Sequence, residues 1–554
     1  MKPGRPPAPE LGDFTATRRV VPISLLAILI GGVAAFVAYA LLRLIDLATN
    51  VFYFQRFSFA PATPAAHHLG PWSVLVPIAG ALVIGLMARF GSERIRGHGI
   101  PEALEAILFH RSRIDPKIAL LKPISSAISI GSGGPFGSEG PIIMTGGALG
   151  SIVAQLFSLT SAERKTLLVA GAAAGMSATF ASPIAAILLA VELLLFEYKP
   201  RSFIPVALAS AVAATTRHFI LGEGPLFPMA PHAAFVGVPA LAACAVAGLL
   251  AGLFSMGLTA AVYKAEDAFK RVPLHWMWWP AIGGLAIGIG GLFCPDALGV
   301  GYASIDRLLH EDMAWSAIAA LVFVKATIWS ISLGSGTSGG VLAPLLMMGA
   351  ALGAIESRYF PAAGVGFWPL VSMAAILGGT MRSPLTGIVF SIELTHDMNM
   401  LLPLAISVTV AHAFTVLALD RSILTEKVAR RDFHVSREYA IDALEILLVR
   451  EAMDAAAPGI GDPVPEGARA ILSTDSVRAA VHRMALEGVG ELVVATPDAP
   501  QVIAGRLVLR DALKARTQQL DQERTRERLL EWERVIPRRL RGSFLVPPAR
   551  RDIG

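Results

Sequence analysis

The sequence predicts an all-α, polytopic membrane protein followed by a small α/β module. Hydrophobic residues make up 54% of its 554 residues and charged residues only 16%, whereas about 25% of a typical soluble domain is charged. The sequence contains several apolar runs whose lengths are close to the roughly 20 residues that a helix needs to cross a membrane. We therefore expect about ten to twelve membrane segments, some of them re-entrant. These runs cover residues 21–42, 72–87, 167–196, 238–261, 279–293, 317–333 and 401–419.

A repeated segment divides the membrane part into two related halves. Residues 131–150 and 334–353 align without a gap, and ten of the twenty aligned positions are identical. A Ser-Pro pair and a Glu-Leu pair follow each copy at nearly the same distance, which places the halves at about residues 70–230 and 280–420. Paired apolar segments interrupted by glycine and proline indicate a transport site near the middle of the membrane. The alternative is an old duplication kept only for packing.

Both ends of the chain are expected in the cytoplasm. Residues 1–19 form a polar leader, and Arg18 and Arg19 adjoin the first span, which favours an inside N-terminus. That span is too long for a cleavable signal peptide. The membrane domain, residues 20–431, ends with the basic stretch 421–431. We therefore expect a multi-pass protein of the plasma (inner) membrane.

Charge and cysteine content exclude several function classes. The net charge of +5 is spread over loops and tail, and it predicts no nucleic-acid partner. Cys244 and Cys294 lie in apolar surroundings, so we expect neither a disulfide nor a metal site. The sequence shows no pairing of a nucleophile with a base, and we expect no enzyme and no cofactor.

Three Gly-rich loops, each opening a helix, are the candidate anion site. Free amides and the positive end of the dipole at a helix start attract an anion without a full cationic charge. Such a site can release its anion, as conduction requires, and none of the loops contains Lys or Arg. The loops are Gly97, His98, Gly99, Ile100 and Pro101; Gly137, Ser138, Glu139, Gly140 and Pro141; and Gly340, Val341, Leu342, Ala343 and Pro344.

Glu139 is the candidate gate. Its partner in the repeat is Leu342, so the fold does not require a carboxylate at this position. Ionisable residues at membrane depth are costly and indicate function. A carboxylate beside anion-binding amides can occupy the place of the anion and leave it when protonated, so Glu139 is also a candidate proton carrier. The alternative is a carboxylate exposed at the loop surface.

Three other polar residues have both a functional and a structural interpretation. His98 is either a hydrogen-bonded structural residue or a direct pore contact, in which a neutral ring donates one N–H and a charged ring attracts anions. Glu192 and Glu393 occupy equivalent positions in the two halves. Their symmetry favours a structural role, such as helix capping or a bond between helices.

The chain becomes soluble in character after the membrane domain. Residues 432–515 contain an amphipathic helix at 473–484 and strands at 491–495 and 502–509, which together predict a β-α-β-β-α-like module. Residues 516–554 are expected to form a charged helix followed by a disordered tail.

Several motifs resemble the CLC family of chloride channels and chloride/proton antiporters. They are GHGIPE at residues 97–102, GSEGP at 137–141, GGVLAP at 339–344, GAAAGMSATFASPIAAIL at 171–188, LGVGY at 298–302 and SPLTGIVFSIELT at 383–395. They follow the family's order over roughly residues 70–430. The resemblance implies an inverted repeat with tilted and partial helices, and a homodimer in the lipid bilayer with one chloride pore per subunit. It also implies that Glu139 is the external gating glutamate and that amides near Glu139, Val341 and Leu342 line the anion sites.

The sequence departs from the family's pattern at four places. His98 replaces the chloride-contacting serine, and Leu424 replaces the tyrosine of the inner pore. Leu193 replaces the internal proton glutamate of the antiporters. The C-terminal module resembles a single CBS domain, which would pair with its twin across the dimer; Asp511 keeps the nucleotide-contacting position, but Val508 replaces its threonine. Adenine nucleotide is therefore a weak expectation.

We accordingly predict a glutamate-gated chloride channel of the voltage-gated type. The absence of an inner proton acceptor at Leu193 favours passive conduction over chloride/proton exchange, which is the first alternative. A second alternative is a pore that prefers fluoride or nitrate, because of His98. A third is a vestigial membrane sensor that signals through its CBS-like module.

Overall fold

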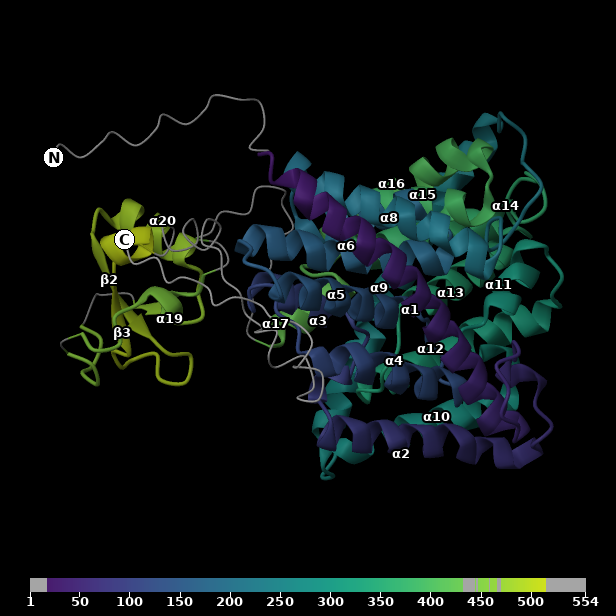
Figure 1. Cartoon of the computed structure of the whole chain (residues 1–554), viewed down its shortest axis with the longest axis horizontal. Coiled ribbons are helices and arrows are strands. Elements are labelled where there is room, and N and C mark those ends of the chain that lie inside the picture. Colours follow the sequence, from purple (N-terminus) through teal and green to yellow (C-terminus); the bar gives the residue numbers. More distant parts are fainter. Residues whose placement is uncertain (1–16, 432–443, 445–446, 458, 466–469, 515–554) are drawn as a thin grey trace, which may run out of the picture.

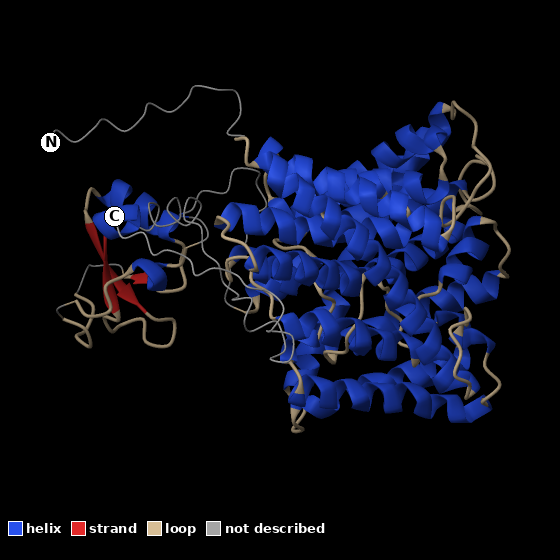
Figure 2. Ribbon diagram, viewed as in Figure 1, coloured by secondary structure: helices blue, strands red, loops and turns tan. Residues whose placement is uncertain are grey.

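The computed structural model describes residues 17–431, 444, 447–457, 459–465 and 470–514. It has a large helical part and a separate small module that contains the strands (Figures 1 and 2). The predicted leader up to residue 16 and the predicted helix and tail at 516–554 lie outside the described residues.

The first half of the helical part runs from α1 to α8. Its α-helices are α1 (Val20–Phe54), α2 (Leu75–Phe90), α3 (Ile100–Leu108), α4 (Pro116–Gly131), α5 (Glu139–Gln155), α6 (Ser161–Phe180), α7 (Pro183–Leu189) and α8 (Pro200–Leu221). Short helices η1 (Pro64–Ala66), η2 (Gly70–Val74) and η3 (Glu93–Ile95) lie between them, and η4 (Ala190–Leu195) continues α7 as a π-helix.

The second half runs from α9 to α17 and repeats this order. Its α-helices are α9 (Val238–Lys270), α10 (Trp279–Phe293), α11 (Tyr302–Leu309), α12 (Trp315–Gly334), α13 (Leu342–Glu356), α14 (Phe367–Met381), α15 (Pro384–Thr395), α16 (Leu401–Ala418) and α17 (Ile423–Ala429). Its short helices are η5 (Trp276–Trp278), η6 (Pro295–Ala297) and η7 (Met398–Met400).

Membrane-spanning helices alternate with shorter ones. Seven helical stretches of the described residues are long and apolar enough to cross a membrane, and four more apolar helices have only 10–17 residues. The chain is therefore an integral, multi-pass membrane protein. The prediction that residues 167–196 form one spanning run is wrong. The helix α6 ends at Phe180, and the following residue, Ala181, has a φ of +55°. Pro183 then starts a new helix, because proline cannot continue the old one.

The repeated glycines allow helices to pack closely in both halves. A Cβ atom at Gly150 of α5 would clash with the Leu167 carbonyl of α6. In the second half, a Cβ atom at Gly353 of α13 would clash with the Trp368 carbonyl of α14. The pairs α5–α6 and α13–α14 are thus equivalent contacts, and glycine is required at each because the backbones approach so closely.

The C-terminal module has a three-stranded sheet, in the order β1-β2-β3. Its elements are α19 (Val449–Ala452), β1 (Ile471–Leu472), α20 (Val477–Glu487), β2 (Glu491–Ala495) and β3 (Gly505–Val508). β1 pairs parallel with β2, and β2 pairs antiparallel with β3 in the register Glu491 to Val508. The predicted strand at 491–495 is confirmed, and the second predicted strand is shorter than expected. β1 is the strand that precedes the helix in the predicted β-α-β-β order, and the sequence did not locate its residues.

Candidate functional site

The three predicted Gly-rich loops meet inside the helical part. Gly137 and Gly340 exchange two backbone hydrogen bonds, of 3.2 and 2.8 Å between nitrogen and oxygen. Gly97 donates to the Thr337 carbonyl at 3.1 Å and accepts from the Gly339 amide at 3.3 Å. Loops that are about 200 residues apart in the sequence, by the offset of the repeat, therefore form one small backbone assembly.

Glycine is required where the starts of α3 and α5 touch. Gly99 has a φ of +91°, and a Cβ atom there would clash with the Gly140 carbonyl. A Cβ atom at Gly140 would in turn clash with the His98 carbonyl. The two helix starts can approach this closely only because both residues lack a side chain. Ile100 and Pro101 begin α3, and Pro141 lies in the first turn of α5.

The carboxylate of Glu139 reaches from the first half to the second. Its side chain is fully buried, and its Oε1 atom accepts a hydrogen bond of 3.0 Å from the Ala343 amide at the start of α13. Its Oε2 atom points at the backbone of Gly137 and Gly340 and has no hydrogen-bond partner among the described residues. The alternative of a carboxylate at the loop surface is wrong. The negative charge occupies a place that backbone amides offer to an anion.

The His98 ring is buried without a partner. The residue is 3% exposed, and its Nδ1 atom is buried with no hydrogen-bond partner among the residues that the structure describes. A buried polar atom without a partner costs free energy, so such an atom needs a specific reason. This favours the interpretation of His98 as a path residue over that of a hydrogen-bonded structural histidine.

Two buried lysines are functional candidates that sequence reasoning missed. Lys122 of α4 donates from Nζ to the carbonyls of Ile95 and Gly97 at 2.8 Å each, and to Ser338 Oγ at 3.1 Å. Lys325 of α12 donates to the carbonyls of Ala297 and Gly299 at 2.9 Å each.

The two lysines are equivalent in the repeat. Lys122 stands nine residues before Gly131, and Lys325 nine residues before Gly334 (131 − 122 = 334 − 325 = 9). Both are fully buried, and neither forms an ion pair with a carboxylate of the described residues. A longer comparison of the two halves could have found them. Each lysine fixes the carbonyls of one loop and places a positive charge close to the loops' amides.

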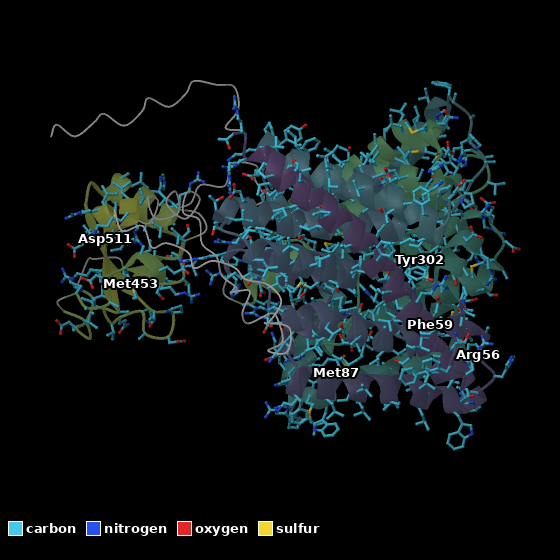
Figure 3. The ribbon with its side chains drawn as sticks, viewed as in Figure 1. Arg56, Phe59, Met87, Tyr302, Met453 and Asp511 are labelled. Atoms are coloured by element: carbon cyan, nitrogen blue, oxygen red, sulfur yellow. The ribbon has the colours of Figure 1, made fainter. Side chains whose placement is uncertain are left out.

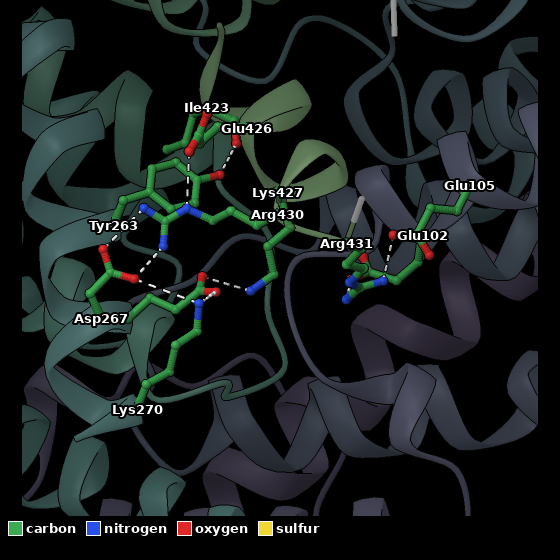
Figure 4. A network of polar contacts seen from close by, with 11 residues as sticks. Glu102, Glu105, Tyr263, Asp267, Lys270, Ile423, Glu426, Lys427, Arg430 and Arg431 are labelled. Atoms are coloured by element: carbon green, nitrogen blue, oxygen red, sulfur yellow. Dashed lines mark hydrogen bonds and ion pairs between the residues drawn. The ribbon is translucent and has the colours of Figure 1, made fainter. Parts of the chain in front are cut away.

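Arg431, which follows α17 directly after Arg430, connects this helix to α3 by ion pairs (Figure 4). Arg431 binds Glu102 at 3.1 Å and Glu105 at 2.6 Å. The other oxygen of Glu102 accepts from the Gly99 amide at 2.8 Å and so caps α3. The guanidinium of Arg431 is thus connected to the His98 loop through one side chain.

Ion pairs and a hydrogen bond also connect α17 to α9. Lys427 binds Glu266 at 2.7 Å, Arg430 binds Asp267, and the Tyr263 hydroxyl donates to the Ile423 carbonyl. Leu424, the predicted inner path residue, is fully buried in α17.

A cavity of about 500 Å³ leads from the surface to the loops. It reaches the backbone of Gly97, Gly334 and Gly336, and the aromatic rings of Trp276 and Trp279 form part of its wall. Basic side chains outnumber acidic ones along it, which raises the local concentration of anions. The charged lining residues are Arg94, Arg96, Lys270, Lys427 and Arg431, with Glu93 and Glu266.

Asp511 lies in the C-terminal module, where its Oδ1 atom accepts from Lys514 at 2.8 Å. Cys244 and Cys294 are both free thiols, and both are buried. In the part of the chain that the structure describes, no cluster of side chains could hold a metal ion.

Comparisons with known proteins agree with this architecture. The model of the family "Voltage gated chloride channel" matches residues 79–416. A ClcB-like chloride channel protein of Ralstonia nicotianae is 30% identical over 349 residues, which are 61% of this chain and 81% of that protein. The H(+)/Cl(-) exchange transporter ClcA of Klebsiella pneumoniae is 29% identical over 401 residues, which are 70% of this chain and 84% of that protein. The crystal structure of a slow cyanobacterial Cl⁻/H⁺ antiporter superposes with a TM-score of 0.65 at 22% identity, covering 75% of this chain and 98% of the other.

Proposed function

The chain belongs to the voltage-gated chloride channel (CLC) family, and we propose that it conducts chloride along a path between the starts of α3, α5 and α13, gated by Glu139. The buried contact between the Glu139 carboxylate and the Ala343 amide carries this proposal. A carboxylate in this place competes with chloride for the same amides. Protonation removes its charge, so the side chain leaves and the anion enters.

The anion meets helix starts and buried cations on this path. The starts of α5 and α13 supply amides at Ser138, Glu139, Gly140, Val341, Leu342 and Ala343. Gly97, His98 and Gly99 form the loop that leads into α3. Lys122 and Lys325 supply the positive charge that the loops themselves lack. The ammonium groups of these lysines donate to backbone carbonyls and not to the anion. Their positive charge therefore attracts the anion from a distance without binding it tightly.

Passive conduction is the mode that we infer. Leu193, where the antiporters of the family have their internal proton glutamate, is fully buried and has no titratable group. The similar proteins include one named as a chloride channel and one named as an exchange transporter. Exchange remains the second candidate, because Glu139 can itself carry a proton. Transport of this kind requires no catalytic residue.

The cavity beside α17 is the proposed cytoplasmic entrance. It lies at the basic end of the membrane domain, which is the end expected on the inside. In this orientation both termini and the C-terminal module are in the cytoplasm. We also propose a homodimer in the inner membrane with one path in each subunit. A vestigial sensor is less well supported, since the Glu139 contact and all three loops are intact.

One assay tests transport and its mode together. Chloride efflux from proteoliposomes is measured while the external pH is recorded, for wild type and Glu139→Gln. Chloride movement without linked protons in the wild type, with a changed rate in the variant, indicates a channel. Proton movement against its gradient that is lost in Glu139→Gln, while chloride still passes, indicates an exchanger. If neither protein moves chloride, the proposed ion is wrong.

The unpartnered ring of His98 favours a test of anion preference. A buried imidazole N–H offers a different donor from the serine hydroxyl that the family has at this position. We expect His98→Ser to change the ratio of chloride flux to nitrate and fluoride flux by several-fold. Equal ratios in wild type and His98→Ser would show that the ring does not select the ion.

A further inference from the structure

Tyr302 is a partly buried tyrosine next to the residue that precedes Glu139. It is the first residue of α11, and its hydroxyl oxygen lies 3.4 Å from Ser138 Oγ. Ser138 is the residue directly before Glu139 and the N-cap of α5. Tyr302 lies on the side of the helical part that faces away from α17 and the C-terminal module (Figures 1 and 3).

The repeat shows that the fold does not require this hydroxyl. Gly97 and Gly99 align with Gly299 and Gly301, so the position of Tyr302 corresponds to Ile100 in the first half. The backbone is equivalent too, since Gly97 and Gly299 each give their carbonyl to a buried lysine. The tyrosine hydroxyl is therefore present in only one half, just as the carboxylate of Glu139 has no counterpart at the aligned Leu342.

Aromatic rings hold the phenol in place. The Phe180 ring at the end of α6 lies 6.3 Å from the Tyr302 ring at an interplanar angle of 89°. The Phe227 ring, from the segment between α8 and α9, lies 6.2 Å away at 63°. Phe227 is itself fixed, because its amide donates to the Leu394 carbonyl at 2.8 Å. These rings leave the hydroxyl beside the start of α5, and the edges of aromatic rings carry partial positive charge.

The charges around this point favour an anion. A Cβ atom at Gly301, directly before Tyr302, would lie 3.8 Å from the Lys325 ammonium. When Glu139 is neutral or has moved away, the buried Lys325 ammonium of α12 is a positive charge close to Tyr302. The hydroxyls of Ser138 and Tyr302 can then both donate a hydrogen bond to an anion. A buried cation without a fixed counter-charge stabilises a mobile anion nearby.

We propose that the Tyr302 hydroxyl binds the transported anion on the side of Glu139 that faces away from α17. It is then an anion-binding residue of the outer part of the path. The inner part has Leu424 where the family has a tyrosine, so this chain has its phenolic donor on the opposite side of the gate. This inference rests on the proposed function, because it requires a path gated by Glu139.

The test is Tyr302→Phe, which keeps the ring and its contacts with Phe180 and Phe227 and removes only the oxygen. Currents across a planar bilayer are measured while chloride is varied on one side at a time. We expect the chloride concentration at half-maximal current to rise about ten-fold on one side only, since a lost hydrogen bond to an ion has about that effect. A merely structural loss would act on both sides alike.

Tyr53→Phe is the matched control. The Tyr53 side chain is buried, and its hydroxyl donates to the Ser132 carbonyl at 3.1 Å. We expect this variant to keep the wild-type chloride dependence on both sides. If Tyr302→Phe does not fold, 3,5-difluorotyrosine introduced at position 302 replaces it. Its more acidic phenol is a stronger donor, and we expect it to lower the half-maximal concentration on the same side.

Glu139→Gln in the same bilayers separates the two proposals. If Glu139→Gln changes gating but Tyr302→Phe leaves the chloride dependence unchanged on both sides, the Tyr302 inference is wrong and the proposed function stands. If Glu139→Gln changes neither the current nor its pH dependence, the proposed function itself is wrong.

Discussion

Glu192 and Glu393 each cap the helix that carries the other. Glu192, in η4 after α7, accepts from the amides of Leu385 and Thr386 at the start of α15, at 3.0 and 2.8 Å. Glu393, near the end of α15, accepts from the amides of Ile184 and Ala185 at the start of α7, at 2.9 and 2.8 Å. The structural role predicted for these two glutamates is confirmed. Each carboxylate also compensates the positive end of a helix dipole.

Removing one cap should destabilise the protein. Glu393→Ala leaves two amides at the start of α7 without their acceptor, and we expect a loss of about 1–3 kcal/mol in the free energy of unfolding. Thermal unfolding in detergent measures it. Glu223→Ala is the control, because that side chain is 77% exposed and should have little effect. Equal stability of the two variants would contradict the capping role.

Glu139 should determine how the current depends on pH. In the wild type we expect chloride flux to rise as the pH falls, because protonation releases the carboxylate from the Ala343 amide. Glu139→Gln cannot ionise, so its flux should be nearly independent of pH. Glu356→Gln is a matched control, since Glu356 is also buried but lies at the far end of α13, bonded to Ser372. A pH response that survives in Glu139→Gln would assign the gate to another group.

The two buried lysines should both be needed for transport. Lys325→Met keeps most of the side-chain length but removes the charge and the bonds to the Ala297 and Gly299 carbonyls. We expect about a ten-fold or larger fall in chloride flux, and a similar fall for Lys122→Met, because both the potential and the loop geometry change. Lys264→Met, at an exposed position of α9, should retain full flux. Wild-type flux in either buried variant would show that the amides suffice.

Arg431 should connect α17 to the path. Arg431→Gln leaves Glu102 buried with the Gly99 amide but without its guanidinium partner, so the start of α3 loses part of its support. We expect slower chloride flux at unchanged protein yield. Arg430→Gln is the control, because Arg430 binds Asp267 of α9 and leaves Glu102 untouched. Should the two variants slow flux equally, the general attachment of α17 would matter and not the Glu102 contact.

The class of the protein and the location of its loops could be predicted from the sequence. Apolar runs and glycine spacing are local patterns, and a duplication repeats them, so the two halves and the three helix starts could be read without coordinates. Glu139 could be singled out because its repeat partner is Leu342. The α6–α7 break was missed, since apolar content is continuous across Ala181 and a backbone turn leaves no trace in hydrophobicity.

Which atoms lie in contact could be seen only in the folded structure. The Ala343 amide lies 204 positions from Glu139 in the sequence, and the Ser338 hydroxyl that accepts from Lys122 lies 216 positions from that lysine. The contact between Ser138 and Tyr302 joins positions 164 apart. Such contacts depend on how the two halves pack against each other, and no spacing within one helix or loop encodes that arrangement. The glycines let the helix starts pack closely. The buried side chains of Glu139 and Lys122 can then form hydrogen bonds with residues of the other half.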